Sequence, residues 1–265
     1  MRQSDKPIRP FGLSLSDASS AHIASLALSA QRSADDGVAL VVTPNIEHIA
    51  RLRRSPGLAA AYRNAAIIVC DGWPVQFYAR ACGLDVERVT GCEIASALMR
   101  ADAFSAWHRL FFVVDRPETE DALRDWAARK ALGDRIEVAI PPFGFESDED
   151  MCRDLAEQIC RHGTTLLLMG VGAPRSEIFV DSHRHQLPPC WAFCVGQAIK
   201  VELGLVRRAP RIWQRSGLEW LWRLAQEPRR LAGRYAGSSI GFGMAVLEDQ
   251  RRRRGKPVDA VGGGR

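Results

Sequence analysis

The hydrophobic and polar positions of this chain follow two alternating periods. Six short apolar runs lie between residues 37 and 196, and each is closed by a proline, a glycine or an aspartate. Between these runs, apolar residues recur every three or four positions, the period of an amphipathic helix. The expected strands are 37–43, 66–70, 109–115, 136–142, 164–172 and 190–196. The expected helices are 46–54, 73–83, 118–133, 148–163 and 174–186.

Strands that alternate with helices predict an α/β fold, a Rossmann-like and mainly parallel sheet with helices on both faces. The local pattern does not give the order of the strands. With 265 residues, 46% of them hydrophobic, the chain can bury a full core. We expect an α/β domain over residues 1–203, a basic helical appendage over 204–247 and a disordered tail over 248–265.

Several classes of protein are disfavoured by composition. No run approaches the roughly 18 apolar residues that a membrane-spanning helix needs, and the polar start lacks the apolar stretch of a secretory signal. We therefore expect the protein in the cytoplasm. The seven cysteines lie mostly within apolar runs, which indicates reduced, buried thiols rather than a disulfide framework.

Positive charge is concentrated near the C-terminus. The net charge of the whole chain is +5, yet residues 207–254 contain twelve arginines and only four acidic residues. A basic segment attached to a near-neutral body predicts an anionic partner, such as a nucleic acid, a membrane surface or a phosphorylated ligand.

Three of the expected strands end in loops with reactive or flexible residues. Thr43 and Asn45 follow the first strand, Asp71 follows the second, and the loop "GVGAPRSE" after the fifth contains Gly172 and Glu177. Each motif alone could be a turn or a helix cap. Together they lie at the carboxyl ends of parallel strands, where such sheets bind ligands. A carboxylate placed there can accept a proton from a bound alcohol.

Five segments resemble successive motifs of the WecG/TagA/CpsF family of bacterial glycosyltransferases. They are "VVTPNIEHI", "AAIIVCDGWPV", "ERVTGCEIASAL", "LLLMGVGAPRSE" and the long C-terminal "VGQAIKVELGLVRRAPRIWQRSGLEWLWRLAQEPRRLAGRY". The resemblance implies an inverting transferase that moves a sugar from a UDP-sugar to an undecaprenyl-diphosphate-linked acceptor. Such an enzyme takes part in the synthesis of a cell-surface polysaccharide or exopolysaccharide.

The resemblance also implies roles for individual residues. Asp71 matches the proposed general base, and Thr43 and Asn45 match residues lining the same pocket. Arg88 matches an arginine expected near the diphosphate of the donor, where a fixed cation stabilises the leaving group. Gly172 and Glu177 lie in a loop expected to bind substrate. The resemblance implies no metal ion or other cofactor.

The basic C-terminus acquires a candidate role from the same resemblance. Arg223, Arg230 and Arg234 would reach the acceptor diphosphate from one helical face if the helix is continuous, although Pro228 favours the start of a second helix. Tryptophans and arginines together predict a peripheral protein on the anionic inner face of the plasma membrane. The tryptophans concerned are Trp213, Trp220 and Trp222. Periodicity alone favours an ordinary amphipathic core helix with a solvated basic face.

The chain departs from the family pattern at three positions. Asp115 stands where relatives have a glycine pair, Ser176 stands in place of a glutamine, and Lys200 takes the position of an acid. These differences predict an altered donor pocket. If Lys200 faces the sugar, a donor with a carboxylate is favoured. An alternative is a weakened or non-catalytic family member that acts as a membrane-associated component of polysaccharide assembly.

Other interpretations are weaker. His183, His185, Cys190 and Cys194 lie close in sequence, but their spacing is not typical of a zinc site. "GVGAP" lacks the third glycine of a dinucleotide-binding loop, which disfavours an NAD-dependent oxidoreductase. The four arginines at 251–254 could bind a polyanion such as DNA, but we expect no nucleic acid partner. A homo-oligomer is possible.

Overall fold

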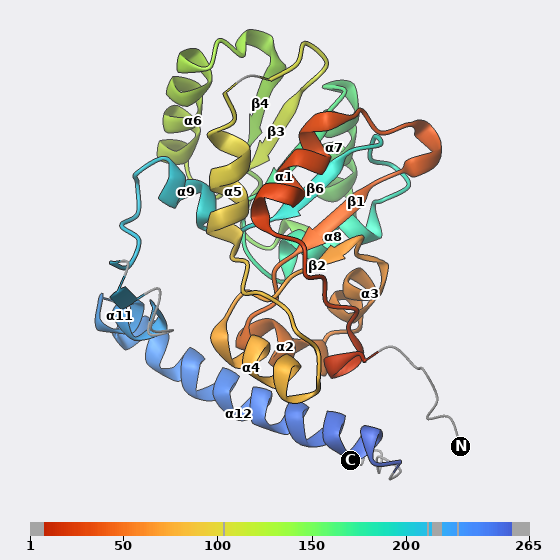
Figure 1. Ribbon diagram of the computed structural model, residues 1–265. Coiled ribbons are helices and arrows are strands. Elements are labelled where there is room, and N and C mark those ends of the chain that lie inside the picture. Colours follow the sequence, from red (N-terminus) through yellow and green to blue (C-terminus); the bar gives the residue numbers. More distant parts are fainter. Residues whose placement is uncertain (1–7, 103, 211, 214–218, 227, 256–265) are drawn as a thin grey trace.

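The computed structural model describes residues 8–102, 104–210, 212–213, 219–226 and 228–255 (Figure 1). Its centre is a single parallel sheet of six strands in the order β2-β1-β6-β5-β3-β4. The predicted α/β class is confirmed, and every expected strand contains an observed one. The strands are β1 (Ala39–Val42), β2 (Ile67–Ile68), β3 (Leu110–Val113), β4 (Ile136–Ala139), β5 (Leu166–Met169) and β6 (Trp191–Cys194).

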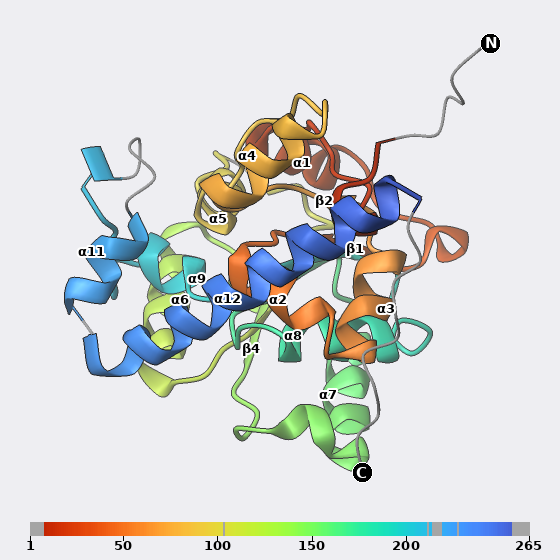
Figure 2. The same ribbon diagram turned by 90° about the horizontal axis from the view of Figure 1, so that it is seen from below.

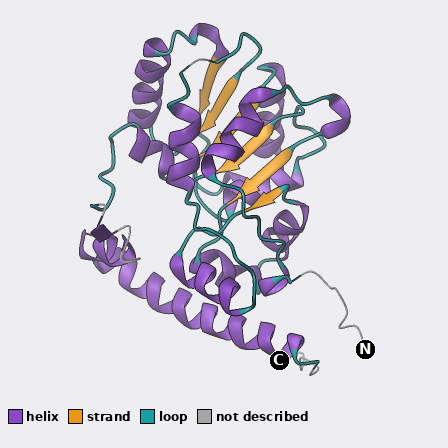
Figure 3. Cartoon of the chain, viewed as in Figure 1, coloured by secondary structure: helices purple, strands orange, loops and turns teal. Residues whose placement is uncertain are grey.

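Helices cover both faces of the sheet (Figure 3). One core layer joins the sheet to α2 (Ile46–Leu52), α3 (Pro56–Asn64), α4 (Trp73–Ala81), α7 (Glu149–Arg161) and α8 (Arg175–Ser182). The other joins it to α1 (Ser20–Ser29), α5 (Gly91–Met99), α6 (Pro117–Arg129) and α9 (Ala198–Glu202). Successive strand residues point into opposite layers, as Val41 and Val42 do, so both must be apolar.

Helices α1, α3 and α5 are not among the predicted elements. Helix α1 has the sequence SAHIASLALS, in which small residues blur the apolar period. Helix α3 follows α2 after a short break, and Pro56 begins it with the capping side chain of Ser55. The single helix expected over 46–54 is therefore the first of two.

The connections of the sheet define where a ligand can bind. Strand β3 leads through α6 to the edge strand β4, whereas its neighbour β5 leads through α8 to β6 on the other side. Adjacent strands whose connections leave in opposite directions open a crevice beyond their carboxyl ends. This end of the sheet points toward α2, α4 and the C-terminal helix in Figure 1.

The C-terminal segment is helical and packs on the α/β domain. Helix α11 (Glu219–Gln226) precedes α12 (Pro228–Arg253), so Pro228 begins a second helix as predicted. A disordered tail was predicted over residues 248–265. The prediction is wrong for residues 248–253, because α12 continues to Arg253. Residues 256–265 lie outside the described part. None of the described helices combines the length and the apolar character needed to cross a membrane.

Specific contacts fix α12 beneath the domain, where it crosses α2 (Figure 2). The Arg53 guanidinium is paired with Glu248, and the Tyr78 hydroxyl donates to Asp249 Oδ2 at 2.9 Å. The Phe242 ring lies 5.6 Å from that of Phe11. Through these contacts Glu248 and Asp249 anchor α12 to the end of α2 and to α4, which the local sequence does not reveal.

Two glycines of α12 provide a matched test of this packing. A Cβ at Gly241 would lie 2.6 Å from the Ala50 Cβ, whereas a Cβ at Gly243 would meet nothing within 4 Å. Since alanine stabilises a helix by about 1 kcal/mol over glycine, Gly243→Ala should raise the free energy of unfolding by up to that amount. Gly241→Ala should lower it by about 1–3 kcal/mol through overpacking. Urea denaturation measures both, and equal effects would show that α12 does not pack closely on α2.

Candidate active site

The loops after β1 and β2 bring three of the predicted residues together. The backbone N–H of Asp71 donates to the carbonyl of Pro44 at 3.0 Å, which ties the second loop to the first. Gly72 has φ +136°, and a Cβ there would lie 3.6 Å from that of Asn45. A residue with a side chain would be strained at this φ, so the glycine allows Asp71 to lie beside Asn45 at the start of α4.

Thr43 lies deeper, at the start of α5. It is buried, and a Cβ on Gly91 would lie 3.5 Å from its Oγ1 and 3.3 Å from the carbonyl oxygen of Val195. The first turn of α5 therefore lies against the ends of β1 and β6. The fold thus places Thr43, Asn45 and Asp71 in adjoining loops; their catalytic roles stay predictions.

Arg88 lies next to the Asp71 loop. Residue 88 forms an isolated parallel bridge with Cys70, and the N–H of Val89 donates to the Cys70 carbonyl at 2.9 Å. The Arg88 guanidinium lies 3.9 Å from Glu93 and 5.9 Å from the centre of the Trp73 ring. A cation is therefore held near Asp71, and its contact with a donor diphosphate stays a prediction.

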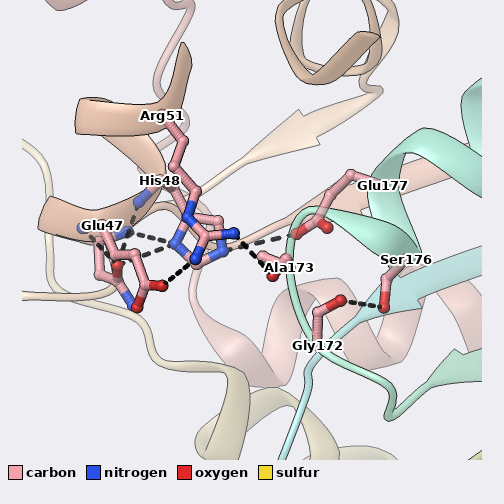
Figure 4. Close-up of polar contacts among 8 residues, drawn as sticks. Glu47, His48, Arg51, Gly172, Ala173, Ser176 and Glu177 are labelled. Atoms are coloured by element: carbon pink, nitrogen blue, oxygen red, sulfur yellow. Dashed lines mark hydrogen bonds and ion pairs between the residues drawn. The ribbon is translucent and has the colours of Figure 1, made fainter. Parts of the chain in front are cut away.

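A polar network that the sequence did not reveal links His48 of α2 to Glu177 of α8 (Figure 4). The Asn45 side chain caps α2, and its Oδ1 accepts from the backbone N–H of Glu47 at 2.9 Å. The same oxygen lies 2.9 Å from Nδ1 of His48, whose Nε2 lies 3.5 Å from Glu177 Oε1. His48 thus joins the first loop to α8. It occupies the third helical position after Asn45, where a capping box has its second member, and this spacing could have identified it.

Glu177 is buried in the first turn of α8. Its side chain is 2% exposed, and its Oε2 has no hydrogen-bond partner within the described residues. Burial raises the pKa of the Tyr62 hydroxyl well above its usual range, and the negative charge of Glu177 raises it further. The same two causes raise the pKa of the Cys194 thiol. Glu177 is thus held against His48, and the substrate-binding role that the sequence predicted for it stays a prediction.

The glycine-rich loop after β5 is held by two contacts. Gly172 has φ +82°, and its carbonyl accepts from the buried hydroxyl of Ser176 at 3.2 Å. Arg51 donates to the Ala173 carbonyl at 3.3 Å and pairs with Glu47 at 2.7 Å, as Figure 4 shows. Ser176, a departure from the family pattern, therefore closes its own loop rather than facing a ligand.

The two remaining departures meet each other. The ammonium nitrogen of Lys200 lies 2.6 Å from Asp115 Oδ1, so these residues form one ion pair across the carboxyl ends of the strands. The expectation that Lys200 meets a donor carboxylate loses its support, because the charge of this lysine is compensated within the chain.

Three C-terminal arginines were predicted to bind the acceptor. The side chains of these residues lie outside the described part of the structure: Arg223, Arg230 and Arg234. Arg208, which sequence reasoning missed, donates to Oγ1 of Thr90 at 3.3 Å and so brings the segment after α9 to the start of α5. Trp222 was predicted at the membrane interface, but its indole nitrogen is buried. Trp220 is 47% exposed and is better placed for an interfacial role.

Comparison with known families decides the class of this site. The family model described as glycosyl transferase WecG/TagA/CpsF family matches residues 8–256, almost the entire chain. The chain belongs to this family. The matched range includes both the α/β domain and α12, so the glycosyltransferase assignment covers the crevice and the C-terminal helices together.

Membership in the WecG/TagA/CpsF family identifies the protein as a glycosyltransferase and disfavours the oxidoreductase alternative. A sugar nucleotide and a lipid-linked acceptor are the general substrates that this family implies. Among the described residues, no three histidine, cysteine, aspartate or glutamate side chains gather in a way that could hold a metal ion. His183 instead has its Nδ1 at 3.1 Å from the Phe179 carbonyl.

Proposed function

We propose that the protein is an inverting glycosyltransferase that uses a UDP-sugar as donor and an undecaprenyl-diphosphate-linked sugar as acceptor. Its product would serve a bacterial cell-surface polysaccharide or exopolysaccharide. The observation that carries the proposal is the position of Asp71, which the chain ties to Pro44, beside Asn45 and Arg88, at the ligand-binding end of a glycosyltransferase sheet.

In the proposed reaction, Asp71 accepts the proton of the acceptor hydroxyl while that oxygen attacks the anomeric carbon. The bond between the anomeric carbon and the UDP oxygen breaks, and UDP leaves with the electron pair. Attack from the face opposite UDP inverts the anomeric configuration. Arg88 stabilises the negative charge that develops on the diphosphate, the task that a metal ion performs in other enzymes.

The C-terminal helices supply the surface for a lipid-linked acceptor. On α12, Ser238, Ala245 and Asp249 are buried against the domain, whereas Ile240, Met244 and Leu247 point away and are exposed. This outer apolar stripe of α12, defined by Ile240, Met244 and Leu247, ends beside the arginines 251–254. Apolar side chains next to cations fit the interface of an anionic membrane. We propose peripheral binding to the inner face of the plasma membrane.

The proposal is tested by a transfer assay with the full chain. A panel of UDP-sugars, neutral and acidic, is combined with a short-chain polyprenyl-diphosphate-linked acceptor, with and without a metal chelator. We expect transfer from at least one UDP-sugar, a product of inverted configuration and no loss of rate with the chelator. Absence of transfer from every donor would favour the alternative of a non-catalytic family member.

A further inference from the structure

The Asp115–Lys200 ion pair lies where a ligand crevice is expected. Asp115 follows β3, and Lys200 belongs to α9 after β6. The Lys200 side chain is 11% exposed, whereas the Asp115 side chain is 41% exposed. The carboxylate is therefore the open member of the pair, and the lysine supports it from the protein side.

A glycine makes this pairing possible. A Cβ on Gly170 would lie 3.0 Å from Ile199 Cδ1 and 3.1 Å from the Val113 carbonyl oxygen. Because Gly170 has no side chain, α9 can lie directly over the ends of β5 and β3. Lys200 follows Ile199 in α9. Because α9 lies close to the end of β3, Lys200 can contact Asp115 in the loop after that strand. The pair consequently sits at the point where the connections of β3 and β5 diverge.

The carboxylate of Asp115 has one oxygen to offer a ligand. Lys200 contacts Oδ1, and in the described part of the chain the Asp115 side chain makes no other ion pair or hydrogen bond. A half-exposed carboxylate held at one oxygen is a pre-oriented acceptor for hydroxyl groups. Its charge is balanced by Lys200, so it does not repel a nearby diphosphate as strongly as an unpaired carboxylate would.

Its place in the sheet indicates which part of the donor it meets. Asp71 follows β2 and Asp115 follows β3, with β1, β6 and β5 between them. Four strand spacings of about 4.8 Å separate the two loops by about 19 Å. This is much wider than one sugar ring. If the anomeric carbon lies at Asp71, the part of a sugar nucleotide that reaches β3 is the nucleoside.

We propose that Asp115, oriented by Lys200, binds the ribose hydroxyls of the donor nucleotide and is a specificity-determining residue for ribonucleotide donors. The inference rests on the proposed function, since it takes Asp71 as the site of sugar transfer. Asp115 is the residue that touches the ligand, and Lys200 is a positioning residue. This role of the pair replaces the selection of an acidic sugar that the sequence predicted for Lys200 alone.

The test compares binding of UDP and 2′-deoxy-UDP to the full chain by titration calorimetry. Hydrogen bonds to a charged group contribute enough that the wild-type protein should bind UDP roughly 10- to 100-fold more tightly than 2′-deoxy-UDP. The double variant Asp115→Asn/Lys200→Met should bind both with the same weak affinity. Removal of both charges avoids the unpaired buried lysine that Asp115→Asn alone would leave.

A second ion pair on α9 gives the control. Arg100 Nε donates to Glu202 Oε1 at 2.5 Å, and the Arg100 side chain is exposed. Arg100→Met/Glu202→Gln also neutralises one ion pair of α9, and it should keep the wild-type ratio of UDP to 2′-deoxy-UDP affinity. Lys200→Met alone should give an intermediate ratio, because Asp115 remains but is no longer held.

The ratio of affinities distinguishes ligand contact from a structural effect, which would weaken both ligands equally. Equal binding of the two nucleotides by the wild-type protein, with sugar transfer intact, would overturn this inference alone. Retention of the wild-type ratio by Asp115→Asn/Lys200→Met would do the same. Failure of the wild-type protein to bind UDP at all would overturn the proposed function together with this inference.

Discussion

Asp71→Asn should retain the fold and lose sugar transfer by about 100-fold or more, because an amide cannot accept the proton of the acceptor hydroxyl. The exchange conserves shape, and the backbone N–H of residue 71 can still donate to Pro44. Binding of UDP should change little, since the loss falls on the chemical step. Initial rates with saturating donor and acceptor measure the effect, and calorimetry with UDP measures binding.

Asp85 offers a matched control for this exchange. It lies shortly after α4, its side chain is 96% exposed, and within the described chain it contacts Arg80 at 3.5 Å. Asp85→Asn also removes one negative charge, but it leaves the loops of the candidate active site unchanged. This variant should transfer sugar at the wild-type rate. If Asp71→Asn transfers sugar at a rate near that of Asp85→Asn, another group must be the base.

Replacement of the outer apolar stripe of α12 should release the protein from membranes. Each of Ile240, Met244 and Leu247 is exposed, and burial of such side chains in a lipid interface contributes about 1 kcal/mol each. The variant Ile240→Ser/Met244→Ser/Leu247→Ser should therefore bind anionic vesicles roughly 100-fold more weakly in a sedimentation assay. Transfer to a vesicle-bound acceptor should fall, whereas transfer to a water-soluble acceptor should not.

Two exposed apolar residues on other helices control for a general loss of hydrophobicity. Leu26 on α1 and Met151 on α7 are also exposed, and Leu26→Ser/Met151→Ser should sediment with vesicles like the wild-type protein. Undiminished vesicle binding by the α12 variant would show that the outer face of α12 is solvated and does not bind the membrane. Raised salt should weaken the binding that remains, because the arginine contribution is electrostatic.

Substitution in the full chain is preferable to removal of the C-terminal segment. Truncation after residue 203 deletes Glu248 and Asp249, the partners of Arg53 and Tyr78. It also exposes Phe11, which packs on Phe242. A shortened chain would lose stability as well as membrane contact, so a fall in its transfer rate would not separate the two causes.

Local patterns correctly predicted which segments are strands and how α12 begins. Apolar runs such as 39–42 can be recognised as strands from the sequence, because a strand buried on both faces requires apolar residues at every position. Pro228 predicts the start of α12, because its fixed φ and missing N–H suit the first turn of a helix. The helices α1 and α3 escaped prediction, since small residues and short breaks weaken their period.

By itself the sequence determined the α/β class, the family and the residues offered at the strand ends, because these depend on neighbours along the chain. Tertiary structure alone decided what those residues meet. Asp115 and Lys200 are far apart in sequence, and they form a pair only because α9 crosses Gly170. His48 reaches Glu177, and Arg53 reaches Glu248, through the strand order and the docking of α12. Parallel strands are joined by long crossovers, so local periodicity does not encode which strands become neighbours.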